Sequence, residues 1–121
     1  MSQHPVTLES LTEQLIEFRD ARDWKQFHSL KDLILSLSLE ASELLELTQW
    51  KSEADFEEQA KQSTFKDRLS EECADVLLYL LLVAERSEID LLAVAHQKIQ
   101  TNAHKYPVEK SRGTAAKYTQ L

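Results

Sequence analysis

Two stretches of the chain, Leu33–Lys51 and Phe65–Arg86, have the apolar periodicity of α-helices but carry acidic residues on their apolar faces. On a helix with about 100° per residue, Glu40 falls among the leucines of the first stretch. Glu72 falls in the same way among the apolar residues of the second. The two stretches therefore repeat one design, in which an acid faces the protein core.

The spacing of the acids is also repeated. Glu43 follows Glu40 by three residues, and Asp75 follows Glu72 by three, so each pair occupies adjacent turns of one helix face. A core-facing carboxylate must be hydrogen-bonded, paired, protonated or metal-bound, because a bare buried charge is very costly. Antiparallel packing would bring all four acids together as oxygen ligands, which suit Mg²⁺ or Mn²⁺. We therefore predict a metal site formed by these four acids.

A solvated surface, a di-iron site or a zinc site accounts less well for these acids. A single Glu-x-x-Glu is usually a solvated helix face, but two such pairs on apolar faces are not. A di-iron bundle needs Glu-x-x-His on two helices, and none of the four histidines has a Glu three residues before it. Zinc is disfavoured because Cys73 is the single cysteine. A non-enzymatic helical adaptor, whose buried acids pair with Lys or Arg, stays open and predicts no metal dependence.

The composition favours one all-α domain that spans residues 1–121. One Gly and two Pro leave few turn signals, and the net charge of −7 argues against a nucleic acid polymer as partner. The longest apolar run, Val76–Ala84, is far shorter than the roughly 20 residues that cross a bilayer, and no leader-like segment opens the chain. With Cys73 alone, these features predict a soluble, cytoplasmic protein that binds no membrane.

The predicted domain is a four-helix bundle. We expect helices at 7–21, 29–51, 65–86 and 90–103, followed by a basic tail at 104–121. In the first helix we expect the charges from Arg19 onwards to end the apolar face. Because the chain is short for an enzyme that must also enclose a substrate, we expect an oligomer.

Two tryptophans outside the apolar faces are candidates for binding a planar base. Trp24 lies in the connection before the second helix and Trp50 at the end of that helix, and we expect them to sandwich the base. On the fourth helix, Asn102 offers a hydrogen-bond donor and an acceptor, and Lys98 lies one turn earlier. Lys and Asn are also common on helix surfaces that bind nothing. Lys98 and Asn102 are therefore candidates for ligand binding only in combination with the acids.

Four motifs, taken together and in order, resemble the MazG-like family of all-α nucleoside triphosphate pyrophosphohydrolases, and within it the dCTP pyrophosphatases. They are ArgAspTrp with GlnPheHis at 22–28, GluAlaSerGluLeu with GlnTrpLys at 40–51, GluGluCysAlaAspValLeu at 71–77, and the run from Lys98 through AsnAlaHisLysTyrPro to SerArgGlyThrAlaAlaLysTyrThr. The similarity covers nearly the whole chain. It departs from the family at Leu39 and Ser42, where close relatives often have glycines.

The resemblance implies a Mg²⁺-dependent reaction in which water attacks the α-phosphorus of a nucleoside triphosphate, with dCTP or a modified dCTP as the expected substrate. It implies that Glu40, Glu43, Glu72 and Asp75 bind the metal and carry catalysis, in a homodimer or homotetramer. It also implies a set of substrate-binding residues: Trp24, His28, Trp50, Tyr79, Lys98, Asn102, Tyr106, Arg112 and Lys117. The related phosphoribosyl-ATP pyrophosphohydrolases are an alternative, against which the two tryptophans and the basic tail count.

Overall fold

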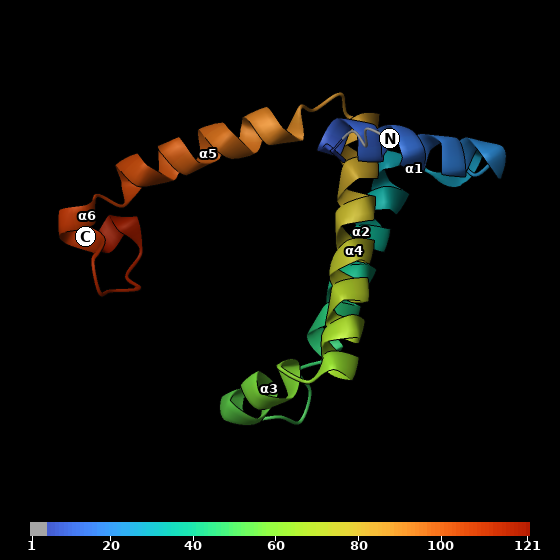
Figure 1. Cartoon of the computed structure of the whole chain (residues 1–121). Coiled ribbons are helices and arrows are strands. Elements are labelled where there is room, and N and C mark those ends of the chain that lie inside the picture. Colours follow the sequence, from blue (N-terminus) through green and yellow to red (C-terminus); the bar gives the residue numbers. More distant parts are fainter. Residues whose placement is uncertain (1–4) are drawn as a thin grey trace. The chain divides into compact units, whose positions relative to one another are not determined.

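The computed structural model describes residues 5–121, which form helices, turns and loops without a β-strand (Figure 1). The predicted all-α fold is confirmed. No helix within these residues has both the length and the hydropathy of a membrane span. The chain divides into two compact units, one ending at Glu88 and one comprising Ile89–Leu121. Residues 1–4 of the predicted domain lie outside the described residues. That residues 1–121 form a single domain stays a prediction.

The first unit is organised around its last helix. It contains α1 (Leu8–Ala21), η1 (Lys25–Phe27), α2 (Leu30–Glu46), α3 (Glu53–Ala60) and α4 (Ser63–Arg86). Three helices, α1, α2 and α3, each pack against α4. Figure 1 shows α2 and α4 side by side with opposite chain directions. This antiparallel pair is the arrangement that the repeated acid spacing requires.

The core of the first unit lies mainly between α2 and α4. Its buried apolar residues are Leu33, Leu47, Phe65, Leu81, Leu82 and Ala84. Each large apolar side chain stabilises the fold by about 1.5–3 kcal/mol when fully buried. Glu40 lies between Leu33 and Leu47 in the sequence and on the same helix face. The packing that buries these leucines therefore also brings Glu40 to α4.

The helix predicted at 29–51 is shorter in the structure, because α2 ends at Glu46. Trp50 has a φ of 63°, in the left-handed region, which cannot continue an α-helix. Lys51 Nζ donates a hydrogen bond of 2.9 Å to the carbonyl oxygen of Leu47, one of the acceptors that a helix end leaves free. The turn after α2 thus carries Trp50 away from the helix.

Helix α3 follows this turn and is not among the four predicted helices. Its Phe56 meets Phe65 of α4 edge to face, with ring centroids 5.5 Å apart. Lys51 Nζ lies 4.6 Å from the centroid of the Phe65 ring, a cation–π distance. These contacts fix α3 at the N-terminal end of α4, which begins at Ser63 and not at residue 65.

The second unit contains α5 (Leu91–Lys105), α6 (Val108–Ser111) and η2 (Tyr118–Gln120). Asp90 caps α5, because its Oδ1 accepts a hydrogen bond of 3.2 Å from the Ala93 backbone. The basic tail at 104–121 is partly helical and folds on itself. The rings of Tyr106 and Tyr118 meet edge to face at 6.0 Å, and Lys105 Nζ lies 4.9 Å from the Tyr118 centroid.

Candidate functional site

Three of the four predicted metal ligands converge between α2 and α4. One carboxylate oxygen from each of Glu40, Glu43 and Glu72 lies within 4.8 Å of the other two. Glu40 and Glu43 belong to α2, and Glu72 belongs to α4. Glu40 and Glu72 are half-buried, whereas Glu43 is exposed. The structure therefore forms an acidic cluster of these three residues where the sequence predicts one.

Glu40 and Glu72 each contribute a buried oxygen that lacks a partner. The Oε2 atom of both residues accepts no hydrogen bond from the described residues. Native proteins rarely leave buried polar atoms unsatisfied, and an unpaired buried carboxylate is especially unfavourable. The donor set consists of oxygen atoms alone, which is the set that hard divalent cations prefer. The residues present therefore fit a divalent metal ion.

The same convergence makes the carboxyl groups harder to ionise. Burial raises the pKa of Glu40 above its ordinary value, and the neighbouring Glu43, Asp75 and Glu72 raise it further. Burial is also the largest cause of the raised pKa of Glu72, followed by the negative charge of Glu43. A bound cation would offset this repulsion. Protons and a metal ion therefore compete for the same oxygens.

Asp75 is placed differently from the acidic cluster. It lies one turn after Glu72 on α4 and is exposed, and it is not among the three acids whose oxygens converge. Its negative charge nevertheless contributes to the raised pKa of both Glu40 and Glu72. Asp75 is thus close enough to act electrostatically on the cluster, and its role as a metal ligand stays a prediction.

The two tryptophans lie at opposite ends of α2. Trp24 precedes this helix and Trp50 follows it, and its 17 residues span about 25 Å at 1.5 Å per residue. Figure 1 shows the segments before and after α2 far apart, the latter beside α3. The two indoles of one protomer are therefore too far apart to contact the same base, and the predicted sandwich of a base between Trp24 and Trp50 stays a prediction. Trp50 is 98% exposed and has no covering residue in this chain's described part.

Trp24 is held in place by the end of α1. Its ring meets Phe18 edge to face at 5.7 Å between centroids. The guanidinium carbon of Arg22 lies 3.7 Å from the Phe18 centroid and 5.9 Å from that of Trp24. Arg22 Nη1 also donates a 2.9 Å hydrogen bond to the Phe18 carbonyl. The indole of Trp24 is therefore fixed while 44% of the residue stays exposed, which suits stacking on a ligand.

The other predicted substrate residues are divided between the two units. His28 and Tyr79 belong to the first unit and are half-buried. The remaining five belong to the second unit: Lys98, Asn102, Tyr106, Arg112 and Lys117. Within α5, Lys98 and Asn102 are exposed and one turn apart, as their spacing predicts. The binding roles of all these residues stay predictions.

Arg19 is a buried charged residue that the sequence prediction missed. Only 5% of it is exposed, and it bonds to Asp20 through Nε at 2.9 Å and to Glu85 through Nη1 at 3.3 Å. Both carboxylates raise the pKa of Arg19 against the opposing effect of burial. On a helical wheel Arg19 lies about 40° from Leu15, so it is within the apolar face of α1 and does not end it. The wheel position that identifies Glu40 would also have identified Arg19.

The protein is therefore an all-α protein with a candidate divalent-cation site, at which carboxylate oxygens from two antiparallel helices lie close together. The chain belongs to the MazG-like family, which matches residues 35–121. The matched region includes all four predicted metal ligands. The resemblance drawn from the sequence motifs is therefore confirmed.

Proteins similar to this chain include dCTP pyrophosphatases and an archaeal pyrophosphatase. The dCTP pyrophosphatase 1 of Rattus norvegicus is 46% identical over 115 residues, which cover 95% of this chain and 68% of that protein. The dCTP pyrophosphatase 1 of Homo sapiens is 38% identical over the same shares. The crystal structure of a pyrophosphatase from Archaeoglobus fulgidus matches with a TM-score of 0.78 and 38% identity, covering 88% of this chain and 98% of that one.

Proposed function

We propose that this protein hydrolyses dCTP, or a modified dCTP, to the nucleoside monophosphate and pyrophosphate in a Mg²⁺-dependent reaction. Its broader class, a nucleoside triphosphate pyrophosphohydrolase, follows from the family and from 38–46% identity to dCTP pyrophosphatases. The observation that carries the finer proposal is the convergence of the Glu40, Glu43 and Glu72 oxygens. A helical adaptor has no need of such an arrangement.

Glu40, Glu43 and Glu72 would hold the metal ion, and Asp75 would join them from the next turn of α4. The buried and unpartnered Oε2 atoms of Glu40 and Glu72 support this assignment. When bound, Mg²⁺ supplies neutralisation of phosphate charge and a lower pKa for coordinated water. Mn²⁺ accepts the same oxygen ligands.

The main task of the protein in this reaction would be to position the substrate and the attacking water. Water attacks the α-phosphorus, the bond from that phosphorus to the bridging oxygen breaks, and pyrophosphate leaves with the bonding electrons. A triphosphate needs no protein nucleophile, because alignment and charge neutralisation account for most of the catalysis in phosphoryl transfer. The rigid pairing of α2 with α4 supports this role, since it fixes the acidic cluster on two packed helices.

Recognition of the base would rest on stacking and on hydrogen bonds. Trp24, already fixed against Phe18, would stack on the base, which contributes about 1–3 kcal/mol. Asn102 would bond to the edge of the base, and Lys98 would bind phosphate. The other members of the proposed substrate site are His28, Trp50, Tyr79, Tyr106, Arg112 and Lys117. A pyrimidine suits a site of this kind, and dCTP is the substrate named for the relatives.

We also propose a homodimer or homotetramer in which α2 contributes its outer face. This face, which points away from Glu40 on the helical wheel, carries four apolar residues that are 46–67% exposed: Ile34, Leu35, Leu39 and Leu45. The hydroxyls of Ser38 and Ser42 donate to backbone carbonyls of α2 at 3.0 and 2.9 Å, so they need no outside partner. A contiguous apolar face of this kind is typical of an interface between protein chains.

The oligomer also gives the two tryptophans a way to meet. Trp24 of one protomer and Trp50 of a second could contact the same base, although the indoles of one protomer cannot. We further propose a cytoplasmic location, which the exposed free thiol of Cys73 supports, since such thiols persist in reducing compartments. Fractionation of the source cells tests the location.

A nucleotide panel tests the proposed reaction. The purified protein would be incubated with Mg²⁺ in ¹⁸O-labelled water and dCTP, dTTP, dUTP, dATP or phosphoribosyl-ATP, and the products separated by ion exchange. We expect the highest kcat/KM for dCTP, with pyrophosphate released and the label in dCMP. Release of inorganic phosphate, or a preference for phosphoribosyl-ATP, would contradict the proposal. An adaptor predicts no turnover of any nucleotide.

A further inference from the structure

Trp50 combines full exposure with an unfavourable backbone conformation. Its φ of 63° lies in the left-handed region, which bulky side chains rarely adopt, and 98% of the residue is exposed. Burial of the indole in the described part of the chain therefore does not offset this strain. Strained backbone persists only where neighbouring contacts hold it, and such residues cluster at ligand sites. The contacts that hold this turn thus determine where the indole of Trp50 lies.

The next residue, Lys51, connects the end of α2 with α3 and α4. Its Nζ donates a hydrogen bond of 2.9 Å to the carbonyl oxygen of Leu47, which precedes Trp50 in the turn. The same atom lies 4.6 Å from the centroid of the Phe65 ring on α4 and 5.9 Å from that of the Phe56 ring on α3. One ammonium group therefore joins the backbone before Trp50 to an aromatic pair that lies after it.

The ammonium group of Lys51 depends on these contacts. Lys51 is half-buried and forms no ion pair with an acid among residues 5–121. Phe65 is only 3% exposed, so its ring is fixed in the core, and Phe56 supports it edge to face at 5.5 Å between centroids. A cation–π contact strengthens as water is excluded from it. The turn is thus anchored to α4, the helix that contributes Glu72 to the acidic cluster.

We propose that Lys51 is a positioning residue, which holds the turn after α2 in the conformation that presents the Trp50 indole to the base of the substrate. This inference rests on the proposed function, in which Trp50 contacts the base. Lys51 acts through Trp50, because its own Nζ is engaged by the Leu47 carbonyl and the Phe65 ring. Without this ammonium group, fewer molecules hold the indole in place. The affinity for the substrate falls in proportion to that fraction.

The mobility of the Trp50 indole tests the proposal without a nucleotide. In a Trp24→Phe background Trp50 is the single tryptophan, and time-resolved fluorescence anisotropy follows its motion. Lys51→Met removes the charge and should increase the amplitude of fast indole motion, whereas Lys51→Arg keeps a cation and should restore the original amplitude. Lys66→Met is the matched control, because Lys66 is exposed on α4 and, among the described contacts, lies over neither ring. It should leave the anisotropy unchanged.

The kinetics of dCTP hydrolysis test the consequence for the substrate. We expect Lys51→Met to raise KM about 2- to 30-fold, the range that loss of a cation–π contact allows, with kcat largely retained. In a Trp50→Ala background the same change should raise KM no further, because its effect passes through the indole. Lys51→Arg should restore KM where Trp50 is present, and Lys66→Met should not alter it.

A second variant keeps the proposal testable if circular dichroism shows that Lys51→Met does not fold. Phe56→Leu removes one ring beside the ammonium group, leaves Lys51 in place, and should also increase the mobility of the indole. Unchanged mobility in both variants would overturn the proposal. An equal effect of Lys66→Met would overturn it as well, since it would mean a general charge effect.

A further rise of KM on adding Lys51→Met to Trp50→Ala would also overturn the proposal, because Lys51 would then contact the substrate or act on another part of the site. Absence of dCTP hydrolysis by the unmodified protein would refute the proposed function alone, since the mobility measurement needs no nucleotide.

Discussion

Glu40 on α2 and Glu72 on α4 face one another across the helix interface, each with a buried Oε2 atom that no described residue satisfies. Burial is the largest cause of the raised pKa of both carboxyls, and nearby acids add to it. This arrangement is unfavourable for the protein alone and favourable when a cation lies between the oxygens. The stability of the α2–α4 pair should therefore be coupled to metal binding.

Replacing Glu40 or Glu72 should reduce activity without reducing stability. We expect Glu40→Gln or Glu72→Gln to lower kcat/KM for dCTP by at least about 100-fold, more than outer-shell changes at metal sites usually cost. The metal-free Tm should stay equal or rise, because the amide removes a repelling charge. Glu46→Gln is the control, since Glu46 is exposed on α2 and is not one of the converging acids. Full activity in either cluster variant would refute the assigned roles.

The raised pKa values give a defined pH dependence of stability. A Glu whose folded-state pKa exceeds its unfolded value of about 4.3 stabilises the fold below that pH and loses this contribution as pH rises through the folded pKa. The metal-free protein should therefore lose unfolding free energy from about pH 4.3 upwards, relative to the Glu40→Gln/Glu72→Gln double variant. Urea denaturation of both proteins at a series of pH values measures this difference. If the unfolding free energies of the two proteins changed with pH in the same way, the link between the raised pKa values and stability would be ruled out.

The acid-bearing helices could be predicted from sequence because burial imposes one periodicity on a helix face. The leucines that place Glu40 toward α4 in the wheel include Leu33 and Leu47, which are buried. The same logic fails where tertiary contacts set the backbone. Periodicity would extend the second helix to Lys51, but α2 ends at Glu46 and Trp50 has a left-handed backbone conformation.

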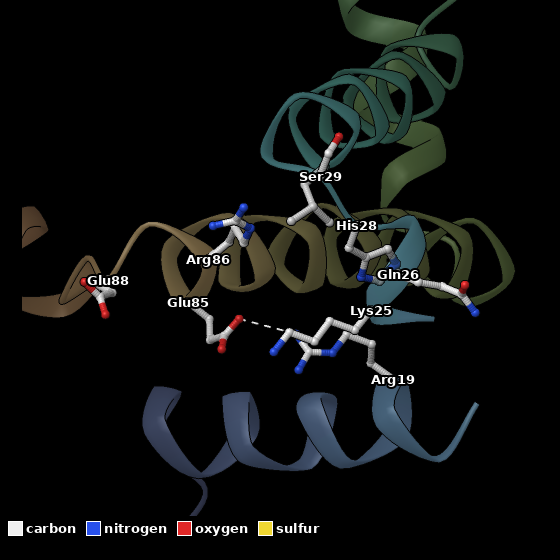
Figure 2. A pocket seen from close by; sticks show the side chains of 9 residues that line it. Arg19, Lys25, Gln26, His28, Ser29, Glu85, Arg86 and Glu88 are labelled. Carbon is white, nitrogen blue, oxygen red and sulfur yellow. Dashed lines mark hydrogen bonds and ion pairs between the residues drawn. The ribbon is translucent and has the colours of Figure 1, made fainter. Parts of the chain in front are cut away.

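Other parts of the molecule depend on contacts between residues far apart in the chain. Arg19 pairs with Glu85, 66 positions later (Figure 2), so no local sequence pattern indicates this ion pair. The position of α3 depends in a similar way on the contact between Phe56 and Phe65. The convergence of Glu40, Glu43 and Glu72 was predictable only because the acids recur on both helices at matching positions.

Trp24 and Asn102 should affect substrate recognition in different ways. Stacking is insensitive to the identity of the base, so Trp24→Ala should lower kcat/KM for dCTP, dTTP and dATP by similar factors, about 5- to 150-fold. A hydrogen bond to the base edge is selective, so Asn102→Ala should narrow the ratios between these nucleotides. Measuring kcat/KM for all three substrates on both variants decides between the roles. Loss of discrimination in Trp24→Ala alone would reverse the assignment.

The outer face of α2 should control assembly. Sedimentation should give the unmodified protein at least twice the 14.0 kDa of one chain. Leu39→Glu and Leu45→Glu should shift it toward the monomer, because each puts a charge into the proposed apolar contact. Ala54→Glu on α3 adds the same charge at another exposed position and should not dissociate the oligomer. A fully active monomer would exclude a site shared between protomers.

The dependence of turnover on metal bound at the acidic cluster tests the central claim most directly. Binding of Mn²⁺, followed by electron paramagnetic resonance, and hydrolysis of dCTP would be measured on the same samples of the unmodified protein and of Glu40→Gln. We expect binding and pyrophosphate release to rise together in the unmodified protein, EDTA to abolish both, and Glu40→Gln to lose both while it remains folded. Hydrolysis of dCTP that persists in EDTA, or undiminished Mn²⁺ binding by Glu40→Gln, would contradict the claim.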